Sequence, residues 1–220
     1  MTERTDERHG PLWLLPRSVK HVWRLVLAVA VLAITAVPVE RDNVGALEAQ
    51  VFEFVNGLPA FLYPAVWLVM QFGALLAIPA LAVGAAVLRR WRLAFDLALA
   101  GGLAWVVARV IKDLVDRGRP AQLLDDVLLR DAPLAGHGYV SGHAAVAVAL
   151  ATVASHWLGK KGRLVVWTLA IGVCIGRVYV GAHLPLDVVG GGAMGWAIGS
   201  LVHLALGSPG DHERVRRVGE

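Results

Sequence analysis

The sequence has a single cysteine, Cys174, which excludes an intrachain disulfide scaffold. Charged residues are also scarce: they make up 17% of the 220 residues, whereas hydrophobic residues make up 57%. An average soluble domain is roughly 45–50% apolar and roughly 25% charged. This composition excludes a disordered chain and a collagen-like fibre, and it leaves too little polar surface for a soluble globule. The sequence therefore predicts a polytopic membrane protein.

Long uncharged runs identify the spans, because a transmembrane helix needs about 20 mainly apolar residues. They predict an all-α bundle of six transmembrane helices, at residues 22–37, 64–88, 93–111, 141–158, 164–182 and 186–206. Residues 43–56, and the start of the next apolar run up to Pro64, are expected at the membrane interface. The uncharged run 164–176 has only 13 residues, so the fifth helix must continue past Arg177 to cross the bilayer.

Lysine and arginine are concentrated on one side of this bundle. Fourteen of the 21 basic residues lie in the N-terminal tail, in the loops after the second and fourth spans, and in the C-terminal tail. By the positive-inside rule, the tails at 1–20 and 207–220 are cytoplasmic and flank a membrane domain over 21–206. The basic composition is thus a topology signal in a multi-pass plasma-membrane protein, and it predicts no nucleic-acid partner. The first span is expected to be retained, because the residues after it form a poor signal-peptide cleavage site.

The extracytoplasmic ends of the third to sixth helices collect an unusual set of polar residues. Three cations and two imidazoles at one membrane depth are costly unless an anion pairs with them. Arginine suits phosphate oxygens and lysine supplies a point charge, so a lipid phosphate is the expected partner. The set comprises Lys112, Arg119, Ser141, His143, Arg177, His183 and Asp187.

The spacing of these residues predicts their roles. If a helix begins near Pro185, the carboxylate of Asp187 folds back onto the ring of His183, fixes its tautomer and leaves the other nitrogen as a nucleophile. Ser141 and Gly142 begin the fourth span, where backbone N–H groups bind phosphate oxygens. His143 then lies where a general acid can protonate a leaving oxygen.

Three segments carry a known pattern: 112–120 (Lys, six residues, Arg-Pro), 140–143 (Val-Ser-Gly-His) and 176–187 (Gly-Arg, five residues, His, three residues, Asp). Together they resemble the motifs of the type 2 phosphatidic acid phosphatase (PAP2) family, in the same order. The resemblance covers residues 105–200 and implies a six-span, metal-independent phosphatase with no cofactor. It also implies that His183 becomes phosphorylated, while His143 acts first as acid and then as base.

Two positions depart from the family pattern. Val140 stands in place of a proline, which affects the stiffness of the loop more than the chemistry. Gly176 stands in place of a serine, which removes one hydroxyl that would contact phosphate.

Structural explanations are preferred for the remaining polar residues and glycines. His137, His156 and His203 are expected to be hydrogen-bonded contacts, and Asp96 is expected to pair with Arg92. A metal held by His143, His183 and Asp187 is disfavoured because the adjacent cations repel it. A glycine every fourth residue in the sixth span favours close helix packing inside the bundle over a dimer seam, at Gly191, Gly195 and Gly199.

The sequence thus predicts an enzyme that hydrolyses a lipid phosphomonoester or pyrophosphate at the outer face of the membrane. A polyprenyl pyrophosphate, a phosphatidylglycerophosphate and a phosphatidic acid all remain compatible. A phosphotransferase that uses the same histidine, and a lipid-phosphate binder or transporter without catalysis, are the alternatives. The Ala-, Arg-, Gly- and Val-rich composition favours a high-GC bacterial source.

Overall fold

The chain is a bundle of helices, and the computed structural model describes residues 18–39 and 44–209 of it, with no strand in those ranges. The predicted tails lie mostly outside the described residues. The elements in chain order are α1 (Val19–Val39), α2 (Ala46–Asn56), η1 (Ala60–Leu62), α3 (Tyr63–Met70), η2 (Gln71–Gly73), α4 (Ala77–Val87), α5 (Trp91–Leu114), α6 (Pro120–Leu123), α7 (Gly142–Ser155), α8 (Lys160–Tyr179) and α9 (Pro185–Leu206).

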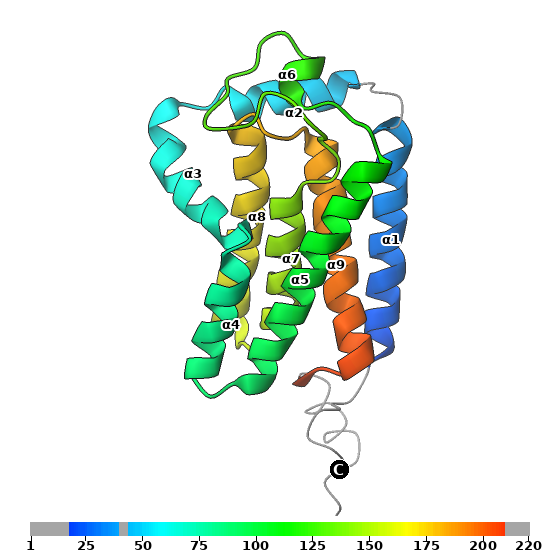
Figure 1. The fold of residues 1–220 in the computed structure, drawn as a ribbon, viewed down its shortest axis with the longest axis vertical. Helices are drawn as coiled ribbons and strands as arrows, with labels where there is room; N and C mark the ends of the chain where they lie inside the picture. The colour runs from blue at the N-terminus through cyan, green and yellow to red at the C-terminus, as the bar shows by residue number, and fades with distance from the viewer. Residues whose placement is uncertain (1–17, 40–43, 210–220) are drawn as a thin grey trace, which may run out of the picture.

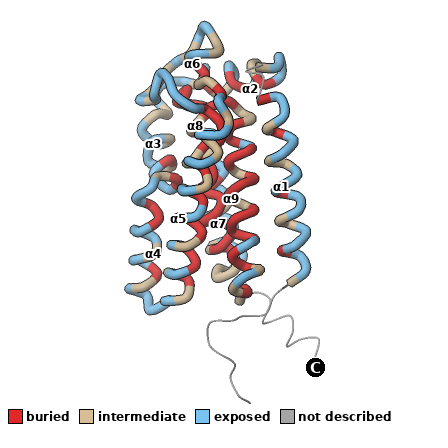
Figure 2. The backbone as a smooth tube through the Cα atoms, turned by 45° about the vertical axis from the view of Figure 1, so that its right-hand side comes forward, coloured by how far each residue is buried: buried red, intermediate tan, exposed pale blue. Residues whose placement is uncertain are grey.

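Helix α7 is the centre of the bundle. It packs against α5, α8 and α9, while α1 lies on the outside of α9 and α4 lies against α5 (Figure 1). All but three of its 14 residues are buried, and most are alanine or valine. Figure 2 shows the same division, with α7 and α9 buried in the middle and α1 and α4 exposed at the periphery. Small side chains let the surrounding helices approach α7 from every side.

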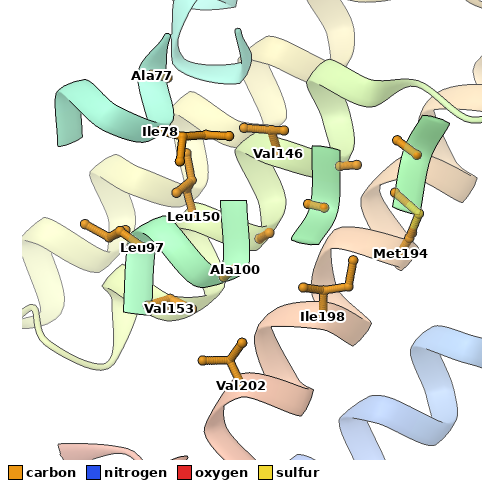
Figure 3. Packing of buried hydrophobic residues seen from close by; sticks show 14 of the residues in the cluster. Ala77, Ile78, Leu97, Ala100, Val146, Leu150, Val153, Met194, Ile198 and Val202 are labelled. Atoms are coloured by element: carbon orange, nitrogen blue, oxygen red, sulfur yellow. The ribbon is translucent and has the colours of Figure 1, made fainter. Parts of the chain in front are cut away.

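The apolar core connects five of these helices, with Val39 from α1. Ile78 of α4, Leu97 of α5, Leu150 of α7 and Ile198 of α9 belong to one buried cluster, which Figure 3 shows from close by. The peripheral helices turn large apolar side chains outward instead, among them Trp23 of α1 at 69% and Val87 of α4 at 76% exposure. An exposed apolar rim around a buried centre fits a bundle whose outer surface faces lipid.

The glycine stripe of α9 faces α7, as the sequence predicted. A Cβ atom on Gly195 would collide with the carbonyl oxygen of Ala145, and one on Gly191 would collide with the carbonyl oxygen of Ser141. At Gly199 an added Cβ would lie 2.7 Å from the Cβ of Thr152. The stripe therefore brings the α7 and α9 backbones together within one chain.

In the part of the chain that the structure describes, four helices are long and apolar enough to cross a membrane: α1, α5, α8 and α9. The bent pair formed by α2 and residues 60–73, with an angle of 74° between its parts, raises the number to five if it counts as one span. Helix α7 has only 14 residues and falls short of a full crossing on its own. Six spans therefore remain a prediction. Helix α8 continues past Arg177 to Tyr179, as predicted from the short uncharged run before Arg177.

The second predicted span is interrupted in the structure. Its residues form α3, η2 and α4, with a break at Ala74, whose backbone is extended (φ −72°, ψ 157°). Helix α2, predicted at the interface, lies across one end of the bundle in Figure 1. An uninterrupted hydropathy pattern contains no signal for such a break, because every residue from 64 to 88 is uncharged.

The α7–α9 contact yields a first prediction. Gly195→Ala should lower the thermal unfolding midpoint of the detergent-solubilised protein, because the added methyl group meets backbone that cannot move aside. The matched control is Gly192→Ala on the same helix, where the nearest atom, Val148 Cγ2, lies at an ordinary 3.7 Å. Equal midpoints for the two variants would contradict the proposed packing.

Candidate active site

The three sequence motifs meet at one end of the bundle, beside α2 and α6 (Figure 1). Lys112 lies in the last turn of α5, and Arg119 follows in the loop that leads into α6. Helix α7 begins at Gly142, directly after Ser141, and Arg177 lies in the last turn of α8. His183 occupies the connection between α8 and α9. The topology therefore collects all of the predicted site residues at one end of the molecule.

Asp187 is fully buried, as is Ser141. Because α9 begins at Pro185, as predicted, the Asp187 side chain folds back over the first turn and accepts a hydrogen bond from the Leu184 N–H (2.9 Å). The same carboxylate oxygen lies 3.7 Å from Nδ1 of His183. This contact is longer than a hydrogen bond, but it directs Nδ1 toward the carboxylate and leaves Nε2 as the other ring nitrogen.

His183 is 3% exposed, and its Nδ1 has no hydrogen-bond partner among the described residues. Burial lowers the pKa of His183 well below its ordinary value. The nearby charges of Arg177, Lys112 and Arg119 lower this pKa further, and so does His143. The ring is therefore neutral near pH 7, and a neutral imidazole carries the lone pair that a nucleophile requires.

Three cations surround this histidine without a carboxylate partner in the described part of the chain. Lys112 Nζ donates to the carbonyl oxygens of His137 (2.8 Å) and Gly138 (3.3 Å). Arg119 donates to the carbonyl oxygen of Ala182 (3.0 Å). Arg177 Nη1 contacts the sulfur of Met70 (3.9 Å), and its Nε is buried without a hydrogen-bond partner among the described residues.

The start of α7 lies directly against the start of α9. The Ser141 N–H donates to the carbonyl oxygen of Asp187 (2.9 Å), while Ser141 Oγ is buried and finds no hydrogen-bond partner among the residues described. Gly142 has open space beside it, because an added Cβ would meet only Ala108 Cβ at 3.9 Å. His143, which is partly accessible, follows in the first turn of α7. Unpartnered donors of this kind suit a ligand rich in acceptor oxygens.

The sequence analysis did not identify the ion pairs beneath the site. Arg117, which is fully buried, donates to Asp187 Oδ1 (2.7 Å) and to both carboxylate oxygens of Glu48 on α2 (2.8 and 3.2 Å). Glu48 also accepts a hydrogen bond from the Leu186 N–H (2.9 Å). A lone arginine in the first motif and an acidic residue of an outer loop carry no sequence signal for this contact.

The two departures from the family pattern are accommodated by packing. Val140 is completely buried within the main apolar cluster. An added Cβ on Gly176 would lie 2.8 Å from Met70 Cγ and 3.0 Å from Val66 Cγ1. Helix α3 therefore occupies the space that a larger residue at position 176 requires.

His143, His183 and Asp187 do not gather as a metal-ligand group. Within residues 18–39 and 44–209, the histidines and acidic residues close enough to share an ion are His21, His156 and His203, at the opposite end of the bundle.

A histidine with several cations around it at one end of a membrane bundle suits a phosphate ligand. Comparison with known proteins gives the family of the chain. Residues 91–208 match the PAP2 superfamily, and the chain belongs to it. An undecaprenyl-diphosphatase from Sulfolobus acidocaldarius is 30% identical over 118 residues, 52% of this chain and 53% of that protein. The chain thus spans about half the length of the curated relative it matches.

Two solved structures share the fold. The LpxE crystal structure from Aquifex aeolicus has a TM-score of 0.67 and 27% identity, covering 72% of this chain and 95% of that one. A PAP2-type phosphatidylglycerolphosphate phosphatase from Bacillus subtilis has a TM-score of 0.62 and 20% identity, covering 91% of this chain and 99% of that one. The protein is therefore a multi-pass membrane protein of the PAP2 superfamily.

The two arginines of the first motif yield a second prediction. Arg117→Met should destabilise the protein by about 3–5 kcal/mol, because it leaves two buried carboxylates without their cation. Arg119→Met, two residues away, removes a cation that has no carboxylate partner and should leave the thermal unfolding midpoint nearly unchanged. The two midpoints, measured side by side in detergent, test the distinction, and a larger loss for Arg119→Met would refute it.

Proposed function

We propose that the protein hydrolyses a phosphomonoester or pyrophosphate of a membrane lipid through a phosphohistidine intermediate on His183. The observation that carries this proposal is the neutral His183, which has a carboxylate on one side of its ring and three cations without carboxylate partners around it. This arrangement suits a phosphorus atom whose negative oxygens need compensation while a nitrogen lone pair attacks.

Substrate binding uses the cations that have no carboxylate partner among the described residues, together with donors at the start of α7. Lys112, Arg119 and Arg177 supply the positive charge for the phosphate oxygens. Ser141 and Gly142, at the start of α7, add hydroxyl and backbone donors, and the N-terminus of the helix favours negative charge.

Catalysis then proceeds in two transfers. Binding of the anionic phosphate beside His143 favours protonation of this ring from solvent. In the first transfer, Nε2 of His183 attacks phosphorus, the bond between phosphorus and the leaving oxygen breaks, and the protonated His143 donates its proton to that oxygen. In the second, His143 accepts a proton from water, the water oxygen attacks phosphorus, and the nitrogen–phosphorus bond breaks to release phosphate. Asp187 keeps the proton of His183 on Nδ1 in the free enzyme and stabilises the charged ring as it forms. No step requires a metal, because the three cations already compensate the phosphate charge.

The relatives support a lipid substrate of this class. Their names include an undecaprenyl-diphosphatase and a phosphatidylglycerolphosphate phosphatase, so both a pyrophosphate and a monophosphate belong in any substrate panel. We propose a polyprenyl pyrophosphate, a phosphatidylglycerophosphate or a phosphatidic acid as the substrate class.

We further propose that this end of the bundle faces the extracytoplasmic side and that both chain termini are cytoplasmic. In support, the turn between α4 and α5, the first turn of α1 and the end of α9 all lie at the end opposite the candidate site (Figure 1). Three basic residues follow α4 or begin α5, namely Arg89, Arg90 and Arg92, and Lys160 and Lys161 begin α8. Such clusters mark cytoplasmic loops.

The catalytic proposal predicts the effect of two substitutions. His183→Ala should abolish phosphate release, because no other residue of the site serves as the nucleophile, whereas Asp187→Asn should remove most of the turnover and leave lipid-phosphate binding largely intact. The assay measures inorganic phosphate released from pyrophosphate and monophosphate lipids in detergent, with EDTA present throughout.

Each alternative gives a different result in this assay. A phosphotransferase would require an acceptor other than water before turnover appeared, and a binder or transporter would bind phosphate without releasing it. Full activity in purified His183→Ala would refute the mechanism, and loss of wild-type activity in EDTA, restored by one divalent ion, would show that the site needs a metal.

The proposed orientation makes a separate prediction. On a Cys174→Ser background, a membrane-impermeant thiol reagent applied to intact cells should label Asp126→Cys and spare Lys161→Cys. Both positions are exposed, and they lie at opposite ends of the bundle. Labelling of Lys161→Cys alone would place the candidate site on the cytoplasmic face.

A further inference from the structure

A second cluster of histidines lies at the end of the bundle opposite the candidate active site. His21 comes from the first turn of α1, His156 follows the last residue of α7, and His203 lies in the last turn of α9. One ring nitrogen from each of the three lies within 4.8 Å of the others. The ring centroids of His156 and His203 are 4.1 Å apart, and the ring centroid of His21 lies 4.9 Å from that of His203. None of these residues belongs to a PAP2 motif.

His203 is the unusual member of this cluster. It is completely buried, and neither of its ring nitrogens has a hydrogen-bond partner within residues 18–39 and 44–209. Leaving a buried polar group unsatisfied costs about 1–3 kcal/mol, and native proteins rarely accept that cost without a reason. The expectation that His203 is a hydrogen-bonded helix contact is therefore wrong, although it holds for His156, whose Nδ1 lies 3.0 Å from the carbonyl oxygen of Thr152.

We propose that His21, His156 and His203 form a binding site for a first-row transition-metal ion such as Zn²⁺, which joins α1, α7 and α9 at this end of the bundle. Three imidazoles are a ligand set that suits zinc, copper or nickel, and a water molecule completes a tetrahedral site. The ion would supply the partner that the ring of His203 lacks.

The surroundings of the cluster provide an outer shell for such a site. Because Nδ1 of His156 donates to the carbonyl oxygen of Thr152, Nε2 of this ring carries the lone pair that a metal needs. Ser208 Oγ lies 3.5 Å from Nε2 of His21 and is itself buried. Nitrogens in a tetrahedral zinc site are about 3.4 Å apart, so the rings close in by about 1 Å when the ion binds.

Arg24 is expected to weaken metal binding at this cluster. Its Nη1 lies 3.2 Å from Nε2 of His156, so the guanidinium and a metal compete for the same lone pair. Arg92 also brings a positive charge near His203. It is paired with Asp96 at 2.8 Å, as the sequence predicted. Arg24 is only partly buried, so its side chain can turn toward solvent when the metal binds. The cluster is thus a metal site whose affinity Arg24 reduces.

This site is separate from the proposed phosphatase chemistry. Asp187 lies in the first turn of α9 and His203 in its last, which places them about 24 Å apart along the helix. The proposed role of the ion is structural. The proposal of this metal site does not depend on catalysis by His183.

The test measures metal binding directly on the full chain, purified in detergent through a tag without histidine, with His9 and His212 replaced by Asn. After EDTA treatment and dialysis against ZnCl2, elemental analysis should find one zinc ion per chain. CoCl2 should give the visible absorption of tetrahedral Co²⁺. Zinc should also raise the thermal unfolding midpoint, because the ion binds the folded state.

Matched variants locate the ion. His203→Asn and, independently, His21→Asn should lose the bound zinc, the cobalt absorption and the shift in midpoint, whereas His137→Asn, in the loop at the other end, should keep all three. Arg24→Ala should bind zinc about tenfold more tightly, because it removes a cation in contact with a ligand. A merely structural histidine cluster predicts no such gain.

Three outcomes would overturn the proposal. They are a wild type that binds no more zinc than His203→Asn, an Arg24→Ala variant with unchanged or weaker affinity, and zinc that is lost from His143→Ala or His183→Ala but retained by His203→Asn. The last result would place the metal at the candidate active site instead and would also contradict the metal-independent mechanism.

Discussion

Moving a carboxylate from water into a protein interior costs several kcal/mol unless a cation and hydrogen bonds replace its hydration. Asp187 meets this requirement through Arg117 on one oxygen and the Leu184 N–H on the other. Arg117 is in turn held by Glu48. The buried carboxylate therefore joins three distant parts of the chain: the start of α9, the loop after α5 and helix α2. The position of His183 depends on this network, because its Nδ1 faces the same carboxylate.

The second requirement is close approach of two backbones. The start of α7 reaches the start of α9 only because glycines on α9 leave room for the α7 backbone, at Gly191 and Gly195. That approach allows the Ser141 N–H to donate to the carbonyl oxygen of Asp187. The second and third motifs, which are more than thirty residues apart in sequence, thus share a hydrogen bond. The glycine stripe therefore positions the site as well as packing the bundle.

The helical fold and the membership of the site could be predicted from sequence, because both follow from local patterns. Hydropathy identified the long spans, and the length argument placed Arg177 inside α8. Lys112, Arg119 and the two histidines were assigned to one site because they lie at the same expected membrane depth. The features that the sequence did not predict have a common physical origin. The break at Ala74, the pairing of Glu48 with Arg117 and the unsatisfied ring of His203 each depend on which segments meet in three dimensions. The residues adjacent in sequence carry no information about such contacts between distant segments.

The two arginines of the first motif show why internal charge compensation matters for the chemistry. Had Asp187 lacked an internal cation, Lys112, Arg119 or Arg177 would have been drawn to it, since each lies close enough to His183 to act on its pKa. Arg117 forms an ion pair with the Asp187 carboxylate and is itself fully buried, so a substrate cannot reach it. The remaining three cations are left with carbonyl oxygens and a thioether, which are weak partners for a full positive charge. A phosphate is a stronger partner for a full positive charge than these groups are, and in the proposed mechanism it brings phosphorus beside the His183 ring, whose Nδ1 faces Asp187.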